Sequence, residues 1–166
     1  VPGPYHSDPD GARVGEGGTV DRSFVRCGTH HYFTASTRAT GAELWRTDGT
    51  AAGTELVKDV RPGEAGSEIA NLCCVGNVVF FQADDGVHGA ELWTSDGTAN
   101  GTVMVSDLRA GPSGSAPSNL VALGGRVVFA AHDGRVGREL WASDGTAAGT
   151  TLVRDVRAGS SSSTPD

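Results

Sequence analysis

The twelve residues ELWRTDGTAAGT at positions 43–54 return as ELWTSDGTANGT at 91–102 and as ELWASDGTAAGT at 139–150. The spacing is the same both times, because 91 minus 43 and 139 minus 91 both give 48 residues. A fixed period of about 40 to 50 residues is typical of propeller blades and of helical solenoids. The chain is therefore a repeat protein.

The repeats are predicted to consist of strands. They are rich in glycine, threonine and β-branched residues and contain no apolar run at helical spacing. In the third repeat, tight turns separate four expected strands, which cover residues 119–123, 126–131, 138–143 and 150–156. The middle strands are apolar on both faces, and we expect Leu92 and Trp93 to point to opposite sides. The pattern predicts an all-β fold, a β-propeller of four-stranded antiparallel blades with three blades per chain, and a β-trefoil is the alternative.

The period also divides the chain into segments. We expect an N-terminal extension at residues 1–18 and a C-terminal tail at 163–166, with repeats at 19–66, 67–114 and 115–162. Within the extension, residues 13–18 resemble residues 61–66, which suggests the inter-blade crossing of a preceding repeat. Three blades do not close a ring, since propellers use about four to eight. We therefore expect a homodimer that completes a six-bladed ring, or membership of a longer repeat array.

The composition excludes some classes of binding partner. With 13 basic and 20 acidic residues the net charge is −7, and no basic stripe is present to bind nucleic acid. No stretch approaches 18 consecutive apolar residues, so no membrane span is expected. The first residues lack both an initiator Met and a charged, then apolar leader, which we interpret as a mature or excised N-terminus compatible with secretion.

The cysteines suggest a link between repeats. Cys27, Cys73 and Cys74 lack the CxxC spacing of a zinc site. With the period of 48 residues, Cys27 in the first repeat is equivalent to Val75 in the second, and Cys73 is equivalent to Val25 in the first. The cysteines therefore occupy neighbouring positions on equivalent strands. A disulfide from Cys27 to Cys73 or Cys74 would join the first two repeats if those strands are adjacent. Three buried free thiols are the alternative.

The DGTxxGT segment is interpreted as a turn. Aspartate accepts hydrogen bonds from the backbone two residues on, glycine supplies positive φ, and threonine caps the turn. A calcium site is the alternative, but each loop brings one carboxylate and lacks EF-hand spacing. The residues concerned are Asp48, Asp96 and Asp144. No other metal or cofactor is expected.

The longer pattern carries a resemblance. An apolar Val-Phe-Phe-x-Ala run, the Gly-x-Glu-Leu-Trp-x-Ser-Asp-Gly-Thr-x-x-Gly-Thr motif and a final Leu-Val-x-Asp resemble the ELWxxDGT repeat family of bacterial secreted and surface proteins, over residues 19–162. The Gly-Gly turn and the following Trp are also similar to kelch repeats. The resemblance implies a propeller-like array outside the cytoplasm, extracellular or on the cell surface, and no catalytic residues. The first repeat departs from the pattern at residues 30–32 and 36–38.

An enzyme is not expected. A residue that is identical in every repeat serves the repeat, whereas catalysis needs a unique constellation of groups. We interpret the repeated glutamates as structural, and Asp59 and Arg61, with their copies, as local ion pairs.

A repeated surface favours a binding function over catalysis, because several equivalent weak sites together give useful avidity. By analogy with other extracellular propellers, we expect multivalent, lectin-like recognition of glycans. The candidate ligand-binding residues in the motif are Trp45, Trp93, Trp141, Glu43, Glu91 and Glu139, although a core role for the tryptophans competes. The loops that differ between repeats add Asp85, His88, Asp133 and Arg135. The alternative function is a structural or adhesion module whose open blade faces mediate self-assembly or protein–protein interaction.

Overall fold

The computed structural model describes residues 24–163, and within them the regular elements are all strands. Each repeat forms its own four-stranded antiparallel sheet, in which strands adjacent in sequence are paired. Sheet 1 consists of β1 (Val25–Cys27), β2 (His30–Thr37), β3 (Gly41–Thr47) and β4 (Glu55–Lys58). Sheet 2 consists of β5 (Ala70–Val75), β6 (Val78–Asp84), β7 (Ala90–Ser95) and β8 (Val103–Ser106). Sheet 3 consists of β9 (Ser118–Leu123), β10 (Arg126–His132), β11 (Arg138–Ser143) and β12 (Thr151–Arg154).

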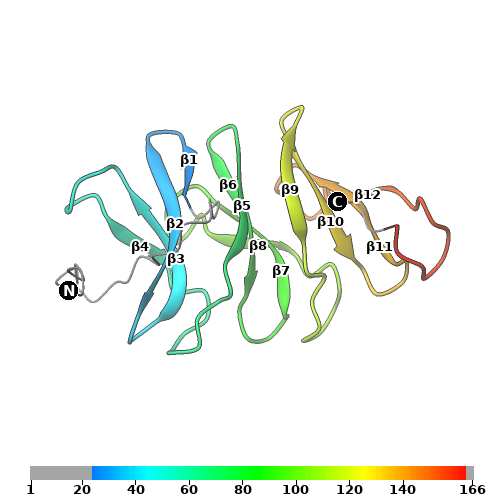
Figure 1. Ribbon diagram of the computed structural model, residues 1–166, viewed down its shortest axis with the longest axis horizontal. Helices are drawn as coiled ribbons and strands as arrows, with labels where there is room; N and C mark the ends of the chain where they lie inside the picture. The colour runs from blue at the N-terminus through cyan, green and yellow to red at the C-terminus, as the bar shows by residue number, and fades with distance from the viewer. Residues whose placement is uncertain (1–23, 164–166) are drawn as a thin grey trace, which may run out of the picture.

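The sheets stand side by side in chain order and do not close into a ring (Figure 1). The all-β class is confirmed, and the strands expected in the third repeat agree with β9 to β12 to within two residues at each end. Within the described part of the chain, strands pair only inside their own repeat, which is not the arrangement of the trefoil alternative. The extension expected at 1–18, residues 19–23 of the first repeat and residues 164–166 of the tail lie outside the described residues.

Apolar side chains fill the space between neighbouring sheets in two clusters. The cluster between sheets 1 and 2 includes Tyr32, Leu44, Val57, Val60, Val79, Phe81 and Trp93. The cluster between sheets 2 and 3 includes Phe80, Leu92, Val105, Leu120, Val127, Phe129 and Trp141. Sheet 2 contributes to both, since side chains alternate along a strand. Leu92 and Trp93 therefore point to opposite faces, as the sequence predicted.

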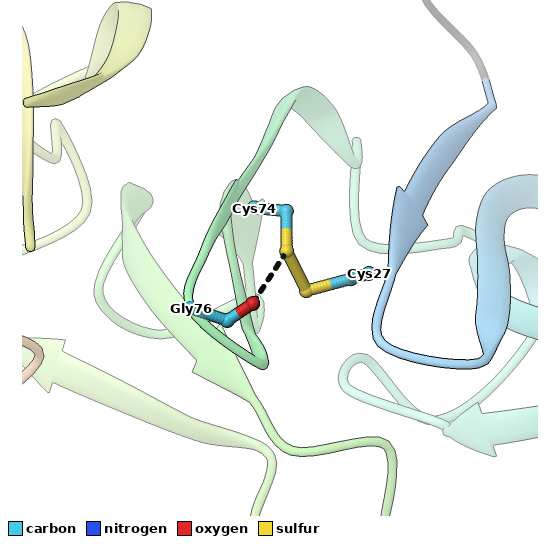
Figure 2. Close-up of a disulfide and its surroundings, with 3 residues drawn as sticks. All are labelled: Cys27, Cys74 and Gly76. Carbon is cyan, nitrogen blue, oxygen red and sulfur yellow. Dashed lines mark hydrogen bonds between the residues drawn. A yellow bond between two sulfur atoms is a disulfide. The ribbon is translucent and has the colours of Figure 1, made fainter.

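A disulfide joins the first two sheets. Cys27 at the end of β1 is bonded to Cys74 in β5, with the two Cα atoms 5.5 Å apart (Figure 2). Cys73 is a free thiol, because its side chain points to the other side of β5, toward the cluster between sheets 2 and 3. Of the two pairings left open by the sequence, the structure has the one with Cys74.

Candidate functional site

The repeated glutamate is a buried acceptor inside each sheet. The three carboxylates, each on a residue that is 0% exposed, belong to Glu43, Glu91 and Glu139. In sheet 2, Oε1 of Glu91 accepts hydrogen bonds from the backbone N–H of Arg109 at 3.0 Å and of Ser115 at 2.9 Å. Its Oε2 accepts from the Ser115 hydroxyl at 2.5 Å. The hydroxyls of Ser67 and Ser163 donate in the same way in sheets 1 and 3. Each carboxylate therefore anchors the segment that leaves its sheet, and none is free to contact a ligand at the surface.

The three carboxylates differ in acidity. Burial raises the pKa of Glu43 and of Glu91 above the ordinary value of a glutamate. At Glu139, the hydrogen bond from the Ser163 hydroxyl lowers the pKa.

The tryptophans lie between sheets. Trp93 and Trp141 are each 7% exposed and belong to the two apolar clusters. Trp45 is half-buried and lies on the side of sheet 1 that faces away from sheet 2. The indole N–H groups of all three are buried and have no hydrogen-bond partner among residues 24–163. A sugar at the surface would not reach Trp93 or Trp141.

The Asp-Gly segment is a turn closed by its own side chains. In sheet 2, Oδ1 of Asp96 accepts from the backbone N–H of Thr98 at 2.8 Å and from its hydroxyl at 2.7 Å. These hydrogen bonds lower the pKa of Asp96. A Cβ added at Gly101 would lie 2.1 Å from the same Oδ1, which explains why glycine is needed there. Asp48 and Asp144 accept the same bonds from Thr50 and Thr146.

The side chains expected in the variable loops make local contacts. Nδ1 of His88 lies 2.7 Å from Oδ2 of Asp85, and this hydrogen bond raises the pKa of His88. Oδ1 of Asp133 accepts from the backbone N–H of Arg135 at 2.8 Å. Among residues 24–163, no group of three or more His, Cys, Asp or Glu side chains is placed to hold a metal ion.

The expected local ion pairs are wrong: none of Asp59–Arg61, Asp107–Arg109 and Asp155–Arg157 forms among residues 24–163. Arg61 does not form an ion pair with Asp59 within the described residues but with Asp84, at 3.7 Å. Asp84 ends β6 of the next sheet, so the contact joins two repeats. Asp59 instead keeps one buried carboxylate oxygen without a partner in this part of the chain.

The outer side of sheet 3 is apolar and open. Val128, Leu140 and Val153 point away from sheet 2, because Trp141 and the other residues next to them along the strands pack toward it. We call Val128, Leu140, Val153 and Val156 the C-terminal end face. Val153 and Val156 are 53% and 63% exposed. The residues at the position of Val153 in sheets 1 and 2 are Val57 and Val105, which are 5% and 6% exposed.

The outer side of sheet 1 is the counterpart. By the same alternation, Phe33, Ala35 and Trp45 point away from sheet 2. We call these three residues the N-terminal end face. Unlike the C-terminal end face it is largely covered, because Phe33 and Ala35 are only 6% and 2% exposed and Trp45 is half-buried. Phe24, which is 51% exposed, stacks on Phe33 with the ring centroids 4.9 Å apart. These end faces are the candidate functional surfaces. The sequence predicted open faces at both ends of the array, but among the described residues the structure shows strongly exposed residues only on the C-terminal end face, at Val153 and Val156. Whether a given valine is covered depends on whether another sheet follows it.

Comparisons with known proteins give information about the fold alone. No family model matches the chain, and no curated protein matches it. A solved prolyl endopeptidase structure is similar, with a TM-score of 0.51 and 14% identity. The match covers 78% of this chain and 19% of that one, so this chain spans about a fifth of the length of that protein. Within residues 24–163, no helix is long and apolar enough to cross a membrane.

Proposed function

We propose that this chain is a non-catalytic interaction module, built of propeller-type repeats, whose two end faces bind further sheets of the same kind. The observation that carries the proposal is the exposure of Val153, 53%, at a position where Val57 and Val105 are 5% and 6% exposed. The residue type is the same in all three sheets, and only the neighbouring sheet is missing. Fully burying a valine or leucine side chain contributes about 1.5 to 3 kcal/mol, so covering this face favours association.

The motif residues support this function over glycan binding. The repeated glutamates and two of the three tryptophans serve the packing of the sheets, and the turn aspartates are occupied by threonines of their own loops. The residues that suggested a sugar site are therefore used inside the fold. A structural or adhesion module, which the sequence analysis gave as the alternative to glycan binding, requires only the apolar end faces.

The setting of the module is part of the proposal. A disulfide between sheets persists in oxidising compartments, and Cys27–Cys74 supports an extracellular or cell-surface location. The ELWxxDGT resemblance points the same way, and we propose membership of that repeat family.

A substitution on the C-terminal end face tests the function. We expect Val153→Glu to abolish the concentration-dependent association of the chain, since a charge would be buried at the contact. Val103→Glu is the matched control, because Val103 is a 45% exposed valine of sheet 2 that lies on neither end face. Sedimentation velocity over a range of concentrations gives the result. Equal association of Val153→Glu and Val103→Glu would refute a role for the C-terminal end face.

A further inference from the structure

We infer that the C-terminal end face of one copy packs on the N-terminal end face of a second copy, head to tail, and that two such seams close a six-sheet dimer. The inference rests on the proposed function and names the partner and its register. Its basis is that the two internal contacts between sheets show which residues meet, and that the end faces carry the same positions.

The apolar residues of the two end faces match the sides of an internal contact. Between sheets 1 and 2, Leu44 and Val57 of one sheet belong to the same cluster as Phe81 and Trp93 of the next. At the seam, the first pair corresponds to Leu140 and Val153, and the second pair to Phe33 and Trp45 of the second copy. Each of the four positions therefore has the same residue type at the seam as in the internal contact.

The Asp-Gly turn gives a second sign of the register. In the internal contacts, the turn of one sheet covers a side chain of the preceding sheet. A Cβ added at Gly97 would lie 2.5 Å from the Tyr32 hydroxyl, and one added at Gly145 would lie 3.3 Å from Phe80. At Gly49 nothing lies within 4 Å. The residue equivalent to Tyr32 and Phe80 in sheet 3 is Val128, which the seam places over Gly49 of the second copy.

A positively charged side chain is a third feature that the seam shares with an internal contact. Nζ of Lys58 donates to the Thr102 carbonyl of the next sheet at 2.8 Å and lies 6.0 Å from the centre of the Trp93 ring. The residue at this position in sheet 3 is Arg154, and the corresponding acceptor in the second copy is the Thr54 carbonyl, next to Trp45. An arginine stacks on an aromatic ring at least as well as a lysine does.

The segment that leaves sheet 3 is built like the internal crossings. Ser163 donates its backbone N–H to Glu139 at 2.8 Å and its hydroxyl at 2.5 Å, as Ser115 does to Glu91 before sheet 3 begins. Two features of the seam are unfavourable. Phe33 is only 6% exposed and Phe24 stacks on it, so Phe24 must leave this ring when the seam forms. The seam also creates a like-charged contact. It brings Arg157 toward Arg38, where the internal contact has Arg61 beside Gly86. This like-charged pair lies at the exposed rim, where salt screens it.

An engineered disulfide tests the register, with Cys27–Cys74 as its template. The seam positions equivalent to Cys27 and Cys74 are Leu123 and, in the second copy, Arg26. Both side chains are exposed, Leu123 to 67%, so replacing them leaves the core of the monomer intact. In a Cys73→Ser background, we expect Arg26→Cys/Leu123→Cys to form a covalent dimer of about twice the 16.9 kDa chain mass in a glutathione redox buffer.

The single variants are the controls. Neither Arg26→Cys nor Leu123→Cys alone is expected to cross-link, whereas an equal mixture of the two is, with the bond located by peptide mass spectrometry. Association of the wild-type chain without this cross-link would overturn the head-to-tail register and leave the proposed function standing. A ladder of larger covalent species would overturn the closed dimer. Absence of both association and cross-link would overturn the inference and the proposed function together.

Discussion

Replacing Glu91 with alanine is expected to reduce the free energy of unfolding by about 3 to 5 kcal/mol, measured by urea denaturation at neutral pH. The substitution leaves three donors without this acceptor, namely the buried hydroxyl and backbone N–H of Ser115 and the partly buried backbone N–H of Arg109. It also opens a cavity beside the strand, since the glutamate is fully buried. The crossing from sheet 2 to sheet 3 would lose its anchor.

Two further variants separate the causes. Glu91→Gln keeps the volume and one carbonyl acceptor, so we expect an intermediate loss, and it remains informative if the alanine variant does not fold. Glu64→Ala removes an exposed glutamate from the crossing between sheets 1 and 2 and is expected to change stability by less than about 0.5 kcal/mol. A loss for Glu91→Ala as small as that for Glu64→Ala would contradict the anchoring role.

The same comparison has a defined pH dependence. Burial raises the pKa of Glu91, so the folded chain binds a proton there more readily than the unfolded chain does. This contribution to stability is full below the unfolded pKa and is lost as the pH rises through the folded value. Glutamine does not titrate. We therefore expect the stability gap between wild type and Glu91→Gln to widen as the pH falls from neutral to about 4.

Loss of the Cys27–Cys74 disulfide is the second large effect. The bond spans 47 residues of sequence, and closing a loop of that length removes about 4 kcal/mol of unfolded-state entropy. We expect the double variant Cys27→Ala/Cys74→Ala to lose stability by about that amount in urea denaturation. Wild-type protein with a reductant should approach the stability of the double variant.

Cys73→Ala is the control for the disulfide. It removes the free, partly buried thiol and leaves the bond intact, so we expect a loss of about 1 kcal/mol that does not abolish the effect of reductant. If wild-type stability were the same with and without reductant, the disulfide would not be the link that holds sheets 1 and 2 together.

Much of the sheet structure follows from the repeated residues themselves. The alternation around Leu92 and Trp93 indicated two buried faces, and the Gly124-Gly125 pair marked the hairpin between β9 and β10. The choice between Cys73 and Cys74 could not be made from sequence. Adjacent residues on a strand point to opposite sides, and only the order of the packed sheets decides which of them faces Cys27.

The candidate site was harder to predict for a physical reason. A repeated glutamate next to a tryptophan suggested a binding surface. However, Ser115, which donates its hydroxyl to the Glu91 carboxylate, lies 24 residues further along the chain, and the segment between sheets 2 and 3 brings it there. Likewise Val153 and Val105 stand in the same motif context, and their exposures of 53% and 6% differ because a sheet covers one and not the other.

We propose that the array of three sheets is completed by a second copy of the chain. The most direct test is the molar mass of the unmodified chain in solution, measured by multi-angle light scattering at increasing concentration. A mass that rises to about twice the 16.9 kDa of one chain and then stays constant is the predicted result. A constant 16.9 kDa at every concentration would contradict the claim.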